Sequence, residues 1–156
     1  MSKTKTPAKK RLPGNHAMCT CAGIRRAARV VTQMYDAALR PVGLTSTQFT
    51  LLAVLSEMGG LALSRVAEVL DTDRTTLNRN LKPLIAEGLI ADARGDDRRQ
   101  RLLELTAAGR ARLAAAEPLW NAAQGHMVAA MGRNRWASLL DGLDAAVDAA
   151  RVGNGP

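Results

Sequence analysis

The chain has 156 residues, enough for a single domain with a sizeable core. Hydrophobic residues make up 47% of it and aromatic residues only 3%, so Ala and Leu supply most apolar positions, which favours packed helices. No apolar run approaches the ~18 residues of a membrane span, and no charged-then-apolar start indicates a signal peptide, so we expect a cytoplasmic protein with no membrane partner.

The net charge is +8, and the excess lies near the N-terminus. Residues 1–40 hold nine Lys or Arg against one acid, whereas the rest of the chain balances at 13 basic and 13 acidic residues. Residues 1–15 carry five of those bases together with prolines and a glycine, and we expect them to form a disordered basic arm. Such an arm either adds non-specific phosphate contacts or serves only as a solubilising tail.

A first helix is predicted over residues 17–39, where apolar residues recur three and four positions apart in a heptad-like seam. The seam consists of Cys21, Ile24, Ala28, Val31, Tyr35 and Ala38. Arg40-Pro41-Val42-Gly43 stops this helix, and the capping-box pattern Thr45-Ser46-Thr47-Gln48 begins a second one. We expect this second helix to end at Gly59-Gly60 and to turn four residues inward, namely Phe49, Leu52, Leu55 and Met58.

Residues 62–88 read as two helices joined by a tight turn. Apolar residues of the first, Leu63, Val66, Ala67 and Leu70, recur at the spacing of one helical stripe. Residues 71–73, Asp-Thr-Asp, break that pattern with side chains that cap helix starts. The second helix is predicted to bury Leu77, Leu81, Leu84 and Ile85. Pro83 lies inside it, and because proline lacks the N–H that would bond back to Arg79, we expect a bend or local loosening there.

The other face of the second helix carries residue types that suit a DNA major groove. Arg and Asn fork onto guanine or adenine edges, and Thr contacts a thymine methyl. The candidate DNA-binding residues on this helix are Arg74, Thr75, Thr76, Asn78, Arg79 and Lys82. An ordinary solvated amphipathic helix pair would have the same apolar spacing. The segment that follows is therefore needed to distinguish a DNA-binding helix pair from an ordinary one.

Glu87-Gly88 ends the helix, since glycine takes a left-handed cap without strain. Residues 89–94 then read as a strand and residues 101–105 as its hairpin partner. Between them lies the polar tip 95–100, whose Arg98 and Arg99 could reach a minor groove or phosphates. A helix-turn-helix followed at once by a basic-tipped hairpin is a winged helix.

Thr106 caps a long helical region that is interrupted at residues 132–134. Its apolar positions exceed what a compact winged region can cover, so helices at both ends of the chain are predicted to pair with each other and with a second copy. A two-fold dimer would set two recognition helices ~34–36 Å apart on a palindromic site. We therefore expect one domain overall, mainly α with a small β-hairpin wing: dimerisation helices at 16–40 and 107–152 around a winged helix-turn-helix at 41–106.

Residues 17–150 resemble the MarR family of bacterial winged-helix regulators. The matching motifs are Leu44-Thr45-x-x-Gln48-Phe49-x-Leu51-Leu52, Leu70-Asp71-x-Asp73-Arg74-Thr75-Thr76-Leu77-x-Arg79, Glu87-Gly88-Leu89-Ile90, Asp97-Arg98-Arg99 and Leu103-x-Leu105-Thr106-x-x-Gly109. The resemblance implies a homodimeric, usually repressing regulator that leaves DNA on binding a small aromatic ligand or on thiol oxidation. It also implies that Arg98 or Arg99 serves the minor groove while Asp97 braces the wing. Asn78 departs from the Thr or Ser common in the family, so base preference is not carried over there.

Cys19 and Cys21, three and five residues after His16, form the one chemically reactive cluster near the first helix. The cysteines could sense oxidants, since the nearby Arg25 and Arg26 favour the thiolate. An internal bridge between residues two apart on a helix would require unwinding, so a bond between subunits is easier. A soft metal would need a fourth ligand from elsewhere. The plain alternative is that Cys21 is a small seam residue and Cys19 is incidental.

An organic effector would lie, by the same resemblance, between the dimer helices and the winged region, with Arg25, Arg29, Tyr35 and Phe49 as candidate lining groups. No cofactor, metal site or catalytic residue is predicted, because the chain has no Gly-rich phosphate loop, no Gly-x-Ser-x-Gly elbow and no HExxH motif. An enzyme is therefore not expected. The alternative to a DNA-binding regulator is a winged-helix module that binds protein instead of specific DNA.

Overall fold

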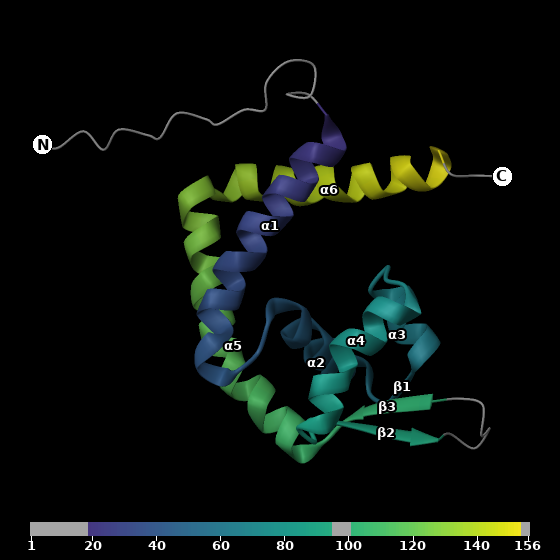
Figure 1. Cartoon of the computed structure of the whole chain (residues 1–156). Coiled ribbons are helices and arrows are strands. Elements are labelled where there is room, and N and C mark those ends of the chain that lie inside the picture. The colour runs from purple at the N-terminus through teal and green to yellow at the C-terminus, as the bar shows by residue number, and fades with distance from the viewer. Residues whose placement is uncertain (1–18, 95–100, 154–156) are drawn as a thin grey trace, which may run out of the picture. The chain divides into compact units, whose positions relative to one another are not determined.

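The computed structural model describes residues 19–94 and 101–153 (Figure 1). Its elements run in the order α1 (Thr20–Leu39), η2 (Arg40–Val42), α2 (Ser46–Met58), β1 (Leu61–Ala62), α3 (Leu63–Val69), α4 (Arg74–Ala86), β2 (Ile90–Arg94), β3 (Arg101–Leu105), α5 (Ala107–Met131) and α6 (Arg133–Gly153). The mainly helical fold with a β-hairpin, predicted from the sequence, is confirmed. The chain divides into two compact units, Met1–Met34 and Tyr35–Pro156, and each is described by itself.

The described part of the first unit is the N-terminal portion of α1. Cys19 precedes the helix, and its carbonyl accepts a 3.0 Å bond from the amide of Gly23. The side chains of this portion are largely exposed: Ile24 of the predicted seam keeps 39% of its surface accessible, and Val30, which lies off the seam, keeps 61%. An apolar seam of this kind has area left to bury against another helix.

The core of the second unit is built around α2. Leu51 and Leu52 are both 0% exposed there, and they pack in one cluster with leucines of α4 and β3. The sequence interpretation of this helix was wrong at one place, since Met58 is 46% exposed. Met58 lies in the last turn, where the chain leaves at Gly59, so its side chain extends past the core.

Side-chain caps set the helix boundaries where the sequence predicted them. Thr45 and Gln48 form the reciprocal capping box at the start of α2. Thr106 caps α5 by accepting a 3.0 Å bond from the amide of Gly109. At the end of α4, Gly88 takes a φ of +69°, the left-handed conformation in which glycine carries no steric cost.

The predicted hairpin is part of a three-stranded antiparallel sheet with the order β1-β3-β2. The register pairs Ile90 with Leu105 and Asp92 with Leu103. The sequence analysis missed β1 and placed Ala62 in a helix. Two residues are too short to show an alternating pattern, and β1 forms only because Leu61 and Ala62 pair with β3.

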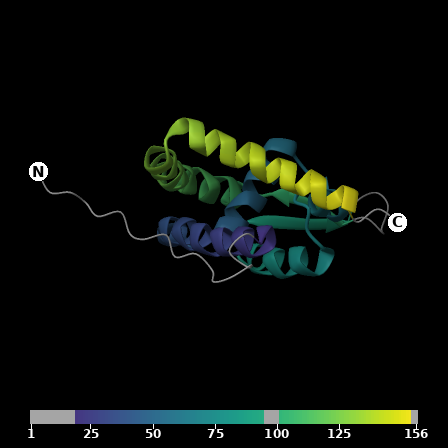
Figure 2. The ribbon, with the colours of Figure 1, turned by 90° about the horizontal axis from the view of Figure 1, so that it is seen from above.

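The C-terminal region consists of two helices that meet at Gly132, whose φ is +80°. This sharp change of direction between α5 and α6 is visible in Figures 1 and 2. Four apolar side chains of α6 remain between 38% and 44% exposed, namely Leu139, Leu140, Leu143 and Val147. Across the described residues, no helix is both long and apolar enough to cross a bilayer.

Candidate nucleic-acid interface

The turn between α3 and α4 is fixed by backbone and side-chain bonds. Asp71 adopts a φ of +46°, a left-handed conformation that aspartate tolerates better than most residues. The amide of Thr72 bonds to the carbonyl of Ala67 at 3.0 Å, and the carboxylate of Asp73 accepts the amide of Thr76 at 2.8 Å. The Asp-Thr-Asp break predicted from the sequence therefore ends one helix in a turn and caps the next helix.

Hydrogen bonding also stabilises the ionised form of the Asp73 carboxyl group. The bond from the backbone amide of Thr76 lowers the pKa of the Asp73 carboxyl below its ordinary value, because the amide stabilises the ionised form. A cap of this kind places a negative charge at the positive end of the α4 dipole.

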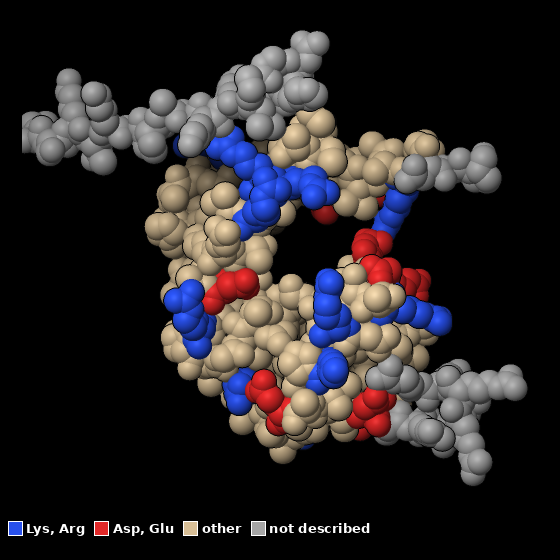
Figure 3. Space-filling model, in the orientation of Figure 1, with Lys and Arg blue, Asp and Glu red and all other residues tan. Residues whose placement is uncertain are grey.

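The two faces of α4 separate as the sequence predicted. Leu77, Leu81 and Leu84 are at most 1% exposed, and they hold the helix on the core. Opposite them, Thr75, Arg79 and Lys82 are exposed along successive turns; we call these three residues the α4 ridge. Lys and Arg side chains lie over α4 on the face shown in Figure 3.

The remaining polar candidates of α4 lie on its flanks. Arg74 is exposed, and its carbonyl accepts a 2.8 Å bond from the side-chain amide of Asn78. This bond ties one N–H of the Asn78 side chain to its own helix. Thr76 is half-buried on the other flank. Pro83 does not end the helix, because α4 continues through it to Ala86.

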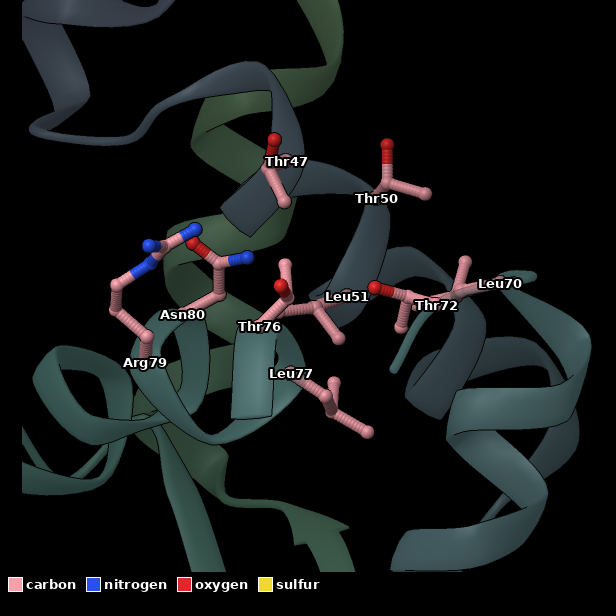
Figure 4. Close-up of a pocket in the computed structure, with 9 residues that line it drawn as sticks. All are labelled: Thr47, Thr50, Leu51, Leu70, Thr72, Thr76, Leu77, Arg79 and Asn80. Carbon is pink, nitrogen blue, oxygen red and sulfur yellow. The ribbon is translucent and has the colours of Figure 1, made fainter. Parts of the chain in front are cut away.

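The residue of α4 that sequence reasoning missed is Asn80. It lines a pocket of about 440 Å³ between α2, the turn that joins α3 to α4, and α4 itself (Figure 4). We call this cavity the threonine pocket, and its walls are Thr47, Thr50, Leu51, Leu70, Thr72, Thr76, Leu77, Arg79 and Asn80. The available clue was that Asn80 follows Thr76 by four residues, which places both on one side of a helix.

The predicted wing residues Asp97, Arg98 and Arg99 lie outside the described residues. The strands β2 and β3 that lead to them are paired along their whole length, from Ile90–Leu105 to Arg94–Arg101. The contribution of Asp97, Arg98 and Arg99 to DNA binding stays a prediction.

Two of the four residues predicted to line a ligand site meet in an aromatic cluster. The ring of Trp120 stacks on Phe49 with centroids 5.6 Å apart and lies 6.5 Å from the ring of Tyr35. The hydroxyl of Tyr35 donates to the side-chain carbonyl of Gln124, and burial raises the pKa of Tyr35. Beside the cluster, Phe49 and Trp120 line a cavity of about 430 Å³.

Sequence reasoning did not assign Trp120 to this cluster. The chain has two Trp, one Tyr and one Phe, and all but Trp136 meet here. The other two predicted ligand residues, Arg25 and Arg29, are exposed on α1 in the first unit, so their part in a ligand site stays a prediction.

Cys19 and Cys21 are both exposed free thiols at the start of α1. Among the described residues, no three His, Cys, Asp or Glu side chains gather as a metal site. His16, the third member of the cluster predicted from the sequence, lies outside that part of the chain.

Comparison with known proteins identifies the group to which this architecture belongs. The model of the MarR family matches residues 42–100. The transcriptional regulator MosR of M. tuberculosis, crystallised in complex with DNA, is 43% identical with a TM-score of 0.75, over 85% of this chain and 98% of that chain. The transcriptional repressor CouR, bound to a 23-mer DNA duplex, is 28% identical with a TM-score of 0.79, over 88% of this chain and 99% of that chain.

A further relative is YwoH, an uncharacterized HTH-type transcriptional regulator of Bacillus subtilis. It is 29% identical over 83 residues, which cover 53% of this chain and 61% of that protein. The chain thus spans about three fifths of the length of this curated relative.

Proposed function

The chain belongs to the MarR family of DNA-binding transcriptional regulators, and from this we propose that it acts as a homodimeric repressor of a palindromic operator. The observation that carries the proposal is the α4 ridge. Thr75, Arg79 and Lys82 stand exposed on a helix whose opposite face is locked into the core by Leu77, Leu81 and Leu84. A rigid helix with such an outer face suits insertion into a major groove.

Dimerisation is supported by apolar surface that the single chain leaves uncovered. Leu139, Leu140 and Leu143 of α6 are each about two fifths exposed, and α1 carries its own apolar seam. Burying this surface against a second copy would stabilise the dimer by about 25 cal/mol for each Å² of apolar area removed from water. A two-fold axis would then present two α4 helices to one face of a duplex.

Release from DNA is proposed to follow one of two routes. In the first, a small aromatic effector enters beside Tyr35, Phe49 and Trp120, where the cavity of about 430 Å³ lies. The relative CouR has been crystallised with p-coumaroyl-CoA, an aromatic thioester.

The second route is oxidation of Cys19 and Cys21. A peroxide would take two thiols to one disulfide, while its two oxygens leave as water. Cys19 lies just before the first turn of α1, so a bridge within the chain requires only that this turn unwinds. A bridge between two subunits leaves the helix intact.

The experiment that tests DNA recognition is fluorescence anisotropy with two labelled duplexes, the DNA just upstream of the coding region and a scrambled version, at about 50 and 200 mM salt. We expect selective binding to the upstream duplex with two chains per duplex. Equal and steeply salt-dependent binding to both duplexes would leave only non-specific phosphate contacts. That result would favour the alternative, a winged helix that binds protein.

The two release routes are separated by adding hydrogen peroxide or p-coumarate to the bound complex. If thiols sense the signal, peroxide releases the wild-type protein but not the Cys19→Ser/Cys21→Ser variant. If the aromatic cluster senses it, p-coumarate releases both proteins equally. If neither hydrogen peroxide nor p-coumarate releases the protein from DNA, both proposed release routes are refuted.

A further inference from the structure

Apart from Arg79, the polar residues that line the threonine pocket do not belong to the α4 ridge. Its lining combines four threonines with Asn80 and Arg79, and it contains no Asp or Glu. Figure 4 shows the Arg79 and Asn80 side chains at one end of the pocket and Thr72 at the other, with Thr47 and Thr50 on the α2 side. The cavity of about 440 Å³ has room for a phosphate group and several waters, since one water takes about 30 Å³ in the liquid.

Some of these polar groups are already engaged within the protein. The hydroxyl of Thr50 donates to the carbonyl of Ser46 at 3.0 Å, and both the backbone amide and the side chain of Thr76 bond to the Asp73 carboxylate. Within the part of the chain that the structure describes, no side-chain hydrogen bond occupies Thr47, Thr72 or Asn80. These three side chains therefore keep their hydrogen-bond donors for a ligand.

The pocket lies on one flank of α4, next to the ridge. A helix lying in a major groove has a sugar-phosphate backbone along each of its sides, because the groove is only about 12 Å wide. A recess beside such a helix faces backbone and not base edges. Hydroxyl and amide groups of Thr and Asn are common partners of DNA phosphates.

We propose that the threonine pocket binds one phosphate of the DNA backbone and so fixes the position of α4 in the groove. The inference rests on the proposed function. Thr47 on the α2 side and Asn80 at one end of the pocket donate neutral hydrogen bonds to the phosphate oxygens, and Arg79 contributes charge from the edge of the ridge. Thr47 also lies in the first turn of α2, where the helix dipole carries partial positive charge.

Asp73 is the one acidic group that caps α4 beside the pocket. Its carboxylate accepts the Thr76 amide at 2.8 Å, so part of its charge is already compensated by the helix it caps. The remaining charge opposes a bound anion. The Asp73→Asn variant, which keeps the cap, is therefore expected to bind DNA more tightly than the wild type.

The test is a cycle that combines Thr47→Val with DNA in which single phosphates are replaced by neutral methylphosphonates. Valine keeps the branched shape and replaces the hydroxyl by a methyl group, so the hydrogen-bonding group is lost. The matched control is Ser56→Ala, which removes an exposed hydroxyl at the other end of α2. Binding of the wild type and both variants is measured on the upstream duplex, the scrambled duplex and the methylphosphonate series.

We expect Thr47→Val to weaken binding to the upstream and scrambled duplexes by the same factor, about 2- to 10-fold, as for one lost hydrogen bond. The slope of log affinity against log salt should not change, since no cation is lost. At one methylphosphonate position the Thr47→Val effect should vanish, and Ser56→Ala should match the wild type throughout.

An equal Thr47→Val effect at every methylphosphonate position, or no effect at all, would overturn the phosphate assignment while leaving the proposed function standing. A changed base preference would also overturn it, because the pocket would then be reading bases. The wild-type measurements report separately on the proposed function. Failure of the wild type to distinguish the upstream from the scrambled duplex would refute that function and, with it, this inference.

Discussion

The rings of Phe49 and Trp120 lie stacked, with centroids 5.6 Å apart and an interplanar angle of 14°. Phe49 belongs to α2 at the centre of the core, and Trp120 belongs to α5, which leads away from the winged region. The contact therefore joins the recognition region to the helix that continues into α6.

Replacing Trp120 by alanine should lower the free energy of unfolding by about 2–3 kcal/mol. The ring is only half-buried, so the loss should be smaller than the 3–5 kcal/mol typical of a fully buried aromatic residue. Trp120→Phe, which keeps a ring against Phe49, should lose about half as much. Urea unfolding followed by circular dichroism at one protein concentration measures both variants. Equal stability of the alanine and phenylalanine variants would mean that the stack contributes nothing.

Gly109 should tolerate no side chain, whereas Gly125 on the same helix should. A Cβ at Gly109 would lie 2.1 Å from the carbonyl oxygen of Leu89, which is backbone and cannot move aside alone. We expect Gly109→Ala to cost about 3 kcal/mol of unfolding free energy, as in overpacked cores. Gly125 has nothing within 4 Å, so Gly125→Ala should stabilise the helix by about 0.5–1 kcal/mol. Thermal melts of both variants test the pair, and similar shifts in the two would contradict the close approach of α5 to Leu89.

The Asp73 cap should make stability depend on pH at the acid end. Because its folded pKa is lowered, the stabilisation by its ionised form is fully present above the ordinary value of 3.8 and is lost as pH falls through the folded pKa. Asp73→Asn keeps a capping oxygen that does not titrate. The advantage of the wild type over this variant should therefore be greatest near pH 6 and shrink towards pH 3. Denaturant unfolding at the two pH values measures it, and a constant difference would contradict a charged cap.

Arg79 and Lys82 should differ in what they contribute to DNA binding. If Arg79 reads a base, Arg79→Ala should cost about 1–3 kcal/mol on the upstream duplex and relax sequence preference. Lys82→Ala should weaken binding to all sequences alike and reduce the salt slope by about one unit, as expected for a phosphate contact. Anisotropy titrations on upstream and scrambled duplexes distinguish the two. Equal loss on both duplexes for Arg79→Ala would remove the base-reading role.

The sequence by itself determined the elements whose cause is local. The capping residues Thr45, Asp73 and Thr106 start helices where predicted, because a side-chain oxygen and a nearby amide are enough to set a boundary. The buried face of α4 could be predicted from leucines at helical spacing, because residues three or four positions apart in a helix lie on the same side.

Tertiary structure decided what depends on residues far apart in the chain. The two-residue strand β1 exists only through its pairing with β3, about 40 residues later. Met58 continues the apolar spacing of α2 but is exposed, because the helix ends before other elements can cover it. The threonine pocket needs α2, the α3–α4 turn and α4 in fixed relative positions, and no local pattern of Asn80 encodes that meeting. The spacing along a helix determines on which face a residue lies, but only long-range packing determines which other elements contact that face.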